Sequence, residues 1–468
     1  MRNEAFLVAI LLTVIFLNLV ILSYKPDLWW DEAVYVSIGK YIFSFGNAGL
    51  FEILRPPVLP LLLGFVWFLG FNPVGFGKLI SLISHASLVC LVYVVVKKVY
   101  GEDKAILSSA FFAFTPFVYM YSTKILTGLL SGTFALISLY LFLSERSKGK
   151  LLLCGIFSGL AFLTRFPGGL VFGGLVITLF LKGLRKPGRM IGNLFIIFSG
   201  FLVIVTPYLL YNLSAYGSPL LPFLEASRQI ESTPWFHNQD PLFYIKQLPM
   251  KNVFFIFSVF GLLFFFKKKD FAHTGKLAVL VTFLLPLLYF HHLEAKNIRF
   301  SLLFLPYLSI FSAYGIHEIS TTFTRKRVKP LVILILLISG VLGIYNLYDS
   351  QIKYMKPPDP ETPYHKFIEY FRSNPTTGTI ITSNAMIGAY TDSKLISLVD
   401  WKLAKKIYDS ERDEASLLAV DTCAIVCKWD DEECLDSRKK FVEYLRNNEI
   451  MKFHEETESC DYFVFEIK

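Results

Sequence analysis

The sequence predicts a polytopic α-helical membrane protein with about 11 transmembrane helices and a C-terminal soluble α/β domain. Its composition is 54% hydrophobic and only 18% charged, with a mean hydropathy of +0.51, which is too apolar for a set of soluble domains. The apolar residues lie in runs of roughly 16 to 23 residues before about position 350. Beyond that point the charge density rises and the apolar runs shorten to the length of strands.

The membrane spans follow from the lengths of these runs, because a helix needs roughly 20 apolar residues to cross a bilayer core of about 30 Å. The first run has no small-residue cleavage site after it, so we expect an uncleaved span. The run 56–70 is short and rich in proline, so we expect it to lie in the interface or to re-enter rather than to cross, as part of the first outer loop. The runs expected to cross are 5–23, 76–96, 105–121, 125–143, 151–165, 168–182, 190–211, 252–266, 277–292, 300–317 and 330–348.

Basic residues predict the orientation of these spans. The formal net charge is +9, but many of the lysines and arginines lie in alternate short loops, the pattern of cytoplasmic loops rather than of a nucleic-acid surface. We therefore expect a multi-pass protein of the cell membrane that binds no nucleic acid. Its N-terminus would be cytoplasmic and its C-terminal domain extracytoplasmic. The basic loops are 97–104, 146–150, 182–189, 267–276 and 325–329.

The chain is expected to divide into a membrane domain (1–350), a proline-rich linker (351–363) and an extracytoplasmic soluble α/β domain (364–468). Four cysteines of the soluble domain, Cys423, Cys427, Cys434 and Cys460, allow three disulfide pairings, with a zinc site as the competing interpretation. A helix is expected over 436–447. Strands are expected over 379–383, 394–399, 423–429 and 462–467.

An acidic pair, Asp31 and Glu32, follows the first span by a few residues. Trp29 and Trp30 would anchor the segment at headgroup depth. Five apolar residues would face lipid on an amphipathic helix, namely Ala33, Val36, Ile38, Tyr41 and Ile42. A carboxylate at this depth is suited to removing a proton from a polar acceptor beside a lipid-anchored substrate. The alternative is structural, with both carboxylates stabilising the start of a helix.

Cations in the outer loops are candidates for binding a phosphate, Arg by a bidentate fork and Lys as a point charge. Taken singly, each would also suit a residue that orients or snorkels at the membrane surface. The cluster His291, His292 and Glu294 allows a metal interpretation, which the spacing supports weakly because adjacent histidines face apart on a helix. The cations are Arg55, Lys124, Arg165, Lys296 and Arg299. Trp235 and His237 are further candidates for contact with a sugar or acceptor, the alternative being a loop packed on the soluble domain.

The order of several motifs along residues 5–320 resembles the type C glycosyltransferases that use polyprenyl-phosphate sugars. This is the group of the dolichyl-phosphate-mannose protein mannosyltransferases and the lipid A aminoarabinose transferases. The motifs are WWDEAVY (29–35), RPPVLPLLLG (55–64), VYGEDKAILSSAFFAFTPFVYMYSTKIL (99–126), GLAFLTRFPGGLVF (159–172), YNLSAYGSPLLPF (211–223) and EAKNIRFSLLFLP (294–306).

The resemblance implies a function and roles for particular residues. Asp31 matches the base that activates an acceptor hydroxyl or amine for inverting attack on the anomeric carbon, with Glu32 beside it. Arg55, Lys124, Arg165 and Arg299 match the positions that hold the lipid phosphate, and Lys296 is a further candidate. Tyr35, His291, His292 and Glu294 are candidate substrate contacts. Related proteins often carry an acidic residue where Gly128 stands, so no obligatory metal is expected here.

The sequence therefore predicts a glycosyltransferase that moves a sugar from a polyprenyl or dolichyl phosphate to a protein, lipid or glycan acceptor on the extracytoplasmic face. An oligosaccharyltransferase would need several metal-binding carboxylates in the outer loops and a larger soluble domain. A transporter or flippase of lipid-linked sugars would need charges within spans and matching broken helices. A non-catalytic receptor or assembly subunit remains a third alternative because of Gly128.

Overall fold

The structure is a computed structural model that describes residues 2–24, 27–144, 147–232, 239–323, 328–354, 359–376, 378–428 and 430–468. Its contacts divide the chain into two compact units. The first unit contains Met1–Ser23, Ile53–Val58 and Lys78–Met355. The second contains Tyr24–Glu52, Leu59–Gly77 and Lys356–Lys468, so it joins the loop after the first helix to the C-terminal part of the chain.

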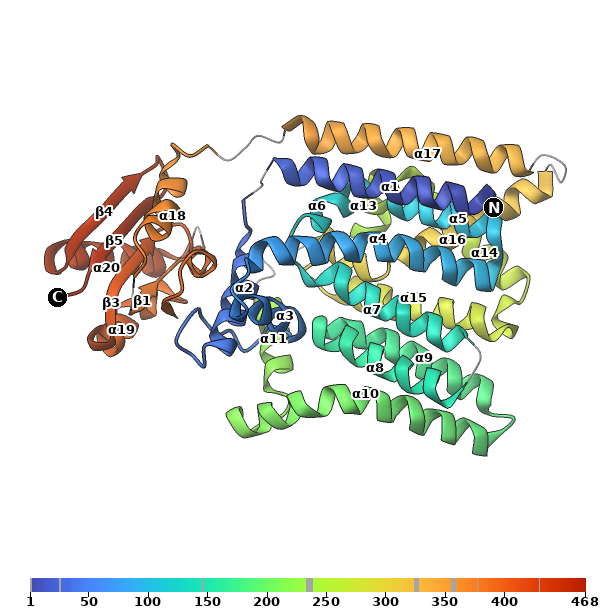
Figure 1. Cartoon of the computed structure of the whole chain (residues 1–468), viewed down its shortest axis with the longest axis horizontal. Helices are drawn as coiled ribbons and strands as arrows, with labels where there is room; N and C mark the ends of the chain where they lie inside the picture. Colours follow the sequence, from blue (N-terminus) through green and yellow to red (C-terminus); the bar gives the residue numbers. More distant parts are fainter. Residues whose placement is uncertain are drawn as a thin grey trace. The chain divides into compact units, whose positions relative to one another are not determined.

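The first unit is helical, and its long helices run roughly parallel to one another (Figure 1). Large apolar side chains fill its interior, among them Phe111, Phe283 and Phe311. Its helices are α1 (Arg2–Ser23), α4 (Pro73–Tyr100), α5 (Glu102–Ala113), α6 (Pro116–Ser122), α7 (Thr127–Leu143), α8 (Lys148–Thr164), α9 (Gly169–Gly183), α10 (Pro187–Tyr216), α11 (Leu221–Ser232), α13 (Phe243–Lys251), α14 (Phe257–Lys267), α15 (Thr274–His292), α16 (Leu305–Phe323) and α17 (Val328–Ser350), with short 3₁₀ helices that include η1 (Phe166–Gly168) and η4 (Ile298–Leu303).

The prediction of about 11 spans is only partly confirmed. Each predicted run falls on a helix or on two consecutive helices. However, only 6 helices of the described residues are long and apolar enough to cross a membrane, or 7 if α5 and α6, which meet at 65°, form one broken span. The excess in the prediction comes from short helices such as α7, with 17 residues, which are apolar but fall below the length of a full span.

The second unit contains a five-stranded mixed sheet with helices packed on its faces (Figure 1). The strand order is β2-β1-β3-β5-β4, with β1 parallel to β2 and β3, and β5 antiparallel to β3 and β4. One apolar core includes α18 and the other includes α19 and α20. The elements are α18 (Pro363–Ser373), β1 (Thr379–Thr382), η6 (Ala385–Ala389), β2 (Lys394–Ser397), α19 (Trp401–Glu411), β3 (Ala415–Asp421), α20 (Glu432–Asn448), β4 (Ile450–Glu456) and β5 (Asp461–Glu466).

The predicted strands over 379–383, 394–399 and 462–467 are confirmed by β1, β2 and β5. The predicted strand over 423–429 is wrong: the strand ends at Asp421, and the described residues that follow it form turns and irregular backbone. The predicted helix over 436–447 lies within α20. Of the expected linker, 355–358 lies outside the described residues, and α18 already begins at Pro363.

Two disulfides decide among the three pairings that the sequence left open. Cys423 is bonded to Cys460 and Cys427 to Cys434, with sequence separations of 37 and 7. The first joins the turn after β3 to the residue before β5. The second joins that turn region to the first turn of α20.

The loop lengths predict unequal contributions to stability. A cross-link that closes a longer loop removes more conformational entropy from the unfolded chain, by about 1.4 kcal/mol for loops that differ as these two do. We therefore expect Cys423→Ser/Cys460→Ser to lower the denaturant midpoint of the soluble domain more than Cys427→Ser/Cys434→Ser. Urea titration of the purified full chain, followed by Trp fluorescence, measures both. Equal shifts would contradict the loop-length argument.

The loop after α1 belongs to the fold of the second unit. Its helix α2 (Trp30–Phe43) places Val34 and Ile38 in the same apolar cluster as Phe367 of α18. Gly49 then extends the sheet edge, since it donates to the carbonyl of Ser393 and accepts from the amide of Leu395, both at 2.8 Å. The expectation of a lipid-facing surface is therefore wrong for Ala33, Val36 and Ile38, which are buried.

Helix α3 (Val58–Phe68) packs tightly against α2. A Cβ atom on Gly39 would lie 2.7 Å from the backbone nitrogen of Gly64, and one on Gly64 would lie 2.2 Å from the carbonyl oxygen of Gly39. Glycine is therefore needed at both positions for the two backbones to approach. At 11 residues, α3 is too short to cross a bilayer core, as expected for the run 56–70.

Candidate functional site

The acidic pair lies in the first turn of α2, where free backbone N–H groups and the helix dipole favour negative charge. Glu32 is fully buried, and its Oε2 accepts a hydrogen bond of 2.8 Å from the backbone nitrogen of Trp29, the residue before the helix. The sequence had left open that the carboxylates stabilise the start of a helix. This hydrogen bond gives Glu32 that structural role. Asp31, directly before it, is half-buried, and Tyr35 lies one helical turn further on and is buried.

The position of α2 is fixed by polar contacts near its C-terminal end. Lys40 is buried; its Nζ donates to the carbonyl of Thr391 at 2.9 Å and lies 3.0 Å from Oδ1 of Asp392. Burial lowers the pKa of Lys40, and the Asp392 carboxylate opposes that shift. Ser37 Oγ accepts from the amide of Leu50 at 2.9 Å. The C-terminal domain therefore holds the helix that carries Asp31.

Within the first unit, two of the predicted phosphate ligands come together at one aromatic ring. Arg165 follows the last residue of α8, and Arg299 is the second residue of η4. Their guanidinium carbons lie 5.2 Å and 5.6 Å from the ring centre of Phe300. The Phe290 ring stacks on Phe300 at 5.3 Å and lies 5.8 Å from the Arg165 guanidinium. Cation–π contacts of this kind help to hold guanidinium groups in place.

Gly128 lies against this arginine cluster, which we define as Arg165, Phe290, Arg299 and Phe300. A Cβ atom at position 128 would be 3.2 Å from Nη1 of Arg165 and 2.9 Å from Cδ1 of Leu302. Related proteins often carry an acidic residue at this position. Its side chain would lie beside the Arg165 guanidinium. With glycine, this helix start brings no carboxylate side chain to the arginine.

The other three cations lie at element ends of the same unit. Lys124 is buried in the link between α6 and α7, and its carbonyl accepts from Ser81 Oγ at 2.6 Å. Lys296 is buried before η4, and it contributes, after Lys246, to lowering the pKa of Asp240. Arg55 is half-buried before α3.

The cluster His291, His292 and Glu294 lies at and beyond the end of α15, with His292 and Glu294 exposed. It is not among the places where three metal-ligating side chains gather. Over the described residues there is one such group, formed by His454, Glu456 and Asp461 on β4 and β5. Trp235 and His237 lie outside the described residues.

Sequence reasoning identified the charged members of the arginine cluster but missed its aromatic members, Phe290 and Phe300. Both are adjacent in sequence to residues of the predicted site, since Phe290 precedes His291 and Phe300 follows Arg299. Among so many phenylalanines, 46 in all, nothing in the sequence distinguishes these two. The start of α7 lies against both η4 and Arg165, and this tertiary packing places Arg299 and Arg165 at one ring.

Comparison with known proteins gives matches in one family and one fold. Residues 54–211 match the family model of the dolichyl-phosphate-mannose-protein mannosyltransferases. No curated protein sequence matches the chain.

Solved structures extend the likeness over nearly the whole chain. ArnT from Cupriavidus metallidurans bound to undecaprenyl phosphate superposes with a TM-score of 0.67 at 11% identity, covering 98% of this chain and 97% of that one. The apo oligosaccharyltransferase of Archaeoglobus fulgidus gives a TM-score of 0.58 at 15% identity, covering 90% and 69%. The archaeal oligosaccharyltransferase AglB from the same organism, with an inhibitory peptide and a dolichol-phosphate, gives 0.55 at 12% identity, covering 98% and 74%. At these identities the likeness shows a shared fold.

Proposed function

We propose that the chain transfers one sugar from a polyprenyl or dolichyl phosphate to an acceptor on the extracytoplasmic face of the membrane. It would do so as a member of the dolichyl-phosphate-mannose-protein mannosyltransferases, whose family model matches residues 54–211. The observation that carries the proposal is the pair of arginines, Arg165 and Arg299, on the ring of Phe300. Arg165 lies inside the matched region, and a guanidinium pair suits the phosphate of a lipid-linked donor.

In the proposed reaction, the Asp31 carboxylate takes the proton from an acceptor hydroxyl or amine. The acceptor atom forms a bond to the anomeric carbon while the bond from that carbon to the phosphate oxygen breaks on the opposite side. The sugar configuration is inverted, and the lipid phosphate leaves with the electron pair. Arg165 and Arg299 stabilise the charge that grows on the departing phosphate. No obligatory metal ion takes part, because the arginines supply this stabilisation.

The relatives in the fold comparison support a lipid-linked donor without naming the sugar. The ArnT structure contains undecaprenyl phosphate, and that of the archaeal oligosaccharyltransferase AglB contains a dolichol-phosphate. We therefore propose that this chain also takes a donor whose leaving group is an isoprenoid lipid phosphate. The acceptor, whether protein, lipid or glycan, is to be found by experiment.

Sugar transfer by the purified chain tests the proposal. We expect radiolabel to move from a synthetic polyprenyl-phosphate monosaccharide to a peptide, lipid or glycan acceptor, with one lipid phosphate released per sugar. The rate should be the same with and without EDTA, and NMR of the product should show the inverted anomer. Transfer only from a lipid-linked oligosaccharide would indicate an oligosaccharyltransferase instead. Movement of intact donor across proteoliposomes without release of phosphate would indicate a flippase.

A further inference from the structure

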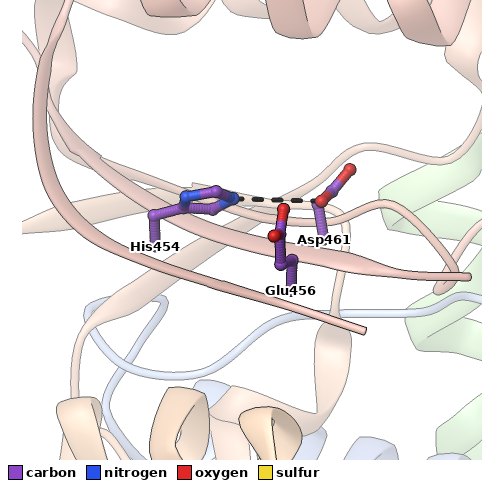
Figure 2. Close-up of side chains that lie close together, drawn as sticks. All are labelled: His454, Glu456 and Asp461. Atoms are coloured by element: carbon purple, nitrogen blue, oxygen red, sulfur yellow. Dashed lines mark ion pairs between the residues drawn. The ribbon is translucent and has the colours of Figure 1, made fainter. Parts of the chain in front are cut away.

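We propose that the β4–β5 hairpin of the soluble domain binds one divalent transition-metal cation through His454, Glu456 and Asp461. Figure 2 shows the three side chains directed toward one another from the two strands, and one ligand atom from each lies within 4.8 Å of the others. His454 Nε2 is 3.9 Å from Asp461 Oδ1. Glu456 and Asp461 are register partners, and His454 precedes Glu456 by two residues, so all three lie on one face of the hairpin.

The charges at this place favour a cation. Glu456 and Asp461 stand directly opposite each other in an antiparallel pair, an arrangement in which like charges repel. Within the described ranges, no lysine or arginine forms an ion pair with either carboxylate, and the basic side chain paired with Asp461 is His454. A cation held between the two carboxylates would remove this repulsion.

Two of the three ligands are held in place before any ion binds. The His454 ring stacks on the buried Phe463 ring, with centres 4.5 Å apart and planes 5° apart. The backbone of Asp461 is fixed by Thr422, whose Oγ1 accepts from its nitrogen at 2.8 Å and whose nitrogen donates to its oxygen at 3.0 Å. The disulfide at Cys460 secures the same end of the hairpin. Pre-positioned ligands lower the entropic cost of binding.

The ligand set indicates the class of metal. Ca²⁺ and Mg²⁺ prefer oxygen ligands throughout, whereas an imidazole with two carboxylates suits Zn²⁺ and related ions. Zinc sits about 2.0–2.2 Å from nitrogen and oxygen ligands, which places tetrahedral ligands roughly 3.3 Å apart. The present separation of 3.9 Å between His454 and Asp461 needs only a small side-chain rotation. Glu456 is exposed and can adjust, and the open side leaves the fourth position for water.

Zn²⁺ binding to the full chain, purified in detergent without a histidine tag and stripped with EDTA, tests the proposal. Isothermal titration should give one site that is lost in His454→Ala and weakened about 10-fold or more in Glu456→Gln and Asp461→Asn. Saturating Zn²⁺ should raise the melting temperature of the wild type and not that of His454→Ala. Ca²⁺ at the same concentration should have neither effect.

Two control variants separate this site from other zinc ligands. His365→Ala removes a second histidine that also faces an aspartate, Asp27 at 2.9 Å, but is not part of a three-ligand group among the described residues. Glu458→Gln removes an exposed charge from the same hairpin. Both should bind Zn²⁺ as the wild type does. Absence of binding in the wild type, or unchanged binding in both His454→Ala and Glu456→Gln, would overturn the proposal. Because Glu456 is exposed, its variant remains informative if His454→Ala fails to fold.

Discussion

Replacing Asp31 with Asn is expected to lower kcat for sugar transfer by about 10²–10⁴-fold, the usual contribution of a positioned general base. Asparagine has the same shape but cannot accept the acceptor's proton. The KM for the lipid donor should change little, because the base acts on the acceptor. Initial rates over a range of donor concentrations, with wild type and variant matched for expression and melting temperature, measure both quantities.

The variant Glu32→Gln tests whether Asp31 or its neighbour takes the proton. Glutamine can still accept the hydrogen bond from the backbone nitrogen of Trp29, so the start of α2 is preserved. If Asp31 is the base, this variant should lose activity only a few-fold. A loss as large as that of Asp31→Asn would assign the proton transfer to the pair or to Glu32. Full activity in Asp31→Asn would remove Asp31 from the mechanism.

Replacing Arg165 with Gln is expected to weaken use of the donor. Truncating one partner of a close charge pair costs about 2–5 kcal/mol, so kcat/KM for the donor should fall by roughly 30-fold to several thousand-fold. Arg165→Lys should be intermediate, since it keeps the charge but loses the planar fork and the stacking on Phe300. Arg299→Gln should resemble Arg165→Gln, because both guanidinium groups lie against the same ring.

A control variant separates phosphate binding from loss of a cation–π contact. Arg446 lies 4.9 Å from the ring of Phe463 in the soluble domain, far along the chain from the arginine cluster. Arg446→Gln removes a comparable contact and should leave kcat/KM unchanged. If Arg165→Gln and Arg299→Gln transferred sugar as well as Arg446→Gln does, the arginine cluster would not be the phosphate site.

The sequence predicted the helices of the first unit well because long apolar runs have few alternative structures in lipid. The sequence predicted more spans than the structure has long apolar helices, because composition does not show where a helix ends. The run 105–121, for instance, bends at the break between Ala113 and Pro116. In the soluble domain, strand 415–421 was missed and 423–429 wrongly predicted. Cys423 and Cys427 add to the apolar character of this segment, so its pattern resembles a strand. In the structure they belong to a turn region that two disulfides hold.

The sequence pointed to candidate site residues only through their charge. Asp31, Arg165 and Arg299 are candidates because ionisable residues near apolar runs are uncommon, and their roles stay predictions. The surroundings of the apolar face of α2 were predicted wrongly. An apolar helix surface has the same sequence pattern whether it contacts lipid or protein. Val34 and Ile38 meet Phe367, more than 300 residues away, and no local pattern reveals such a partner.

The loop after α1 packs with the C-terminal sheet, and this has a consequence for folding during synthesis. Ribosomes add about 5–20 residues per second, so the segment 24–52 emerges roughly 15 to 75 seconds before β2 and α18, with which it packs. During that interval the apolar side chains of α2 have no final partner, and a chain stopped before the soluble domain would leave them so. The helix that carries Asp31 thus reaches its folded surroundings only when synthesis is nearly complete.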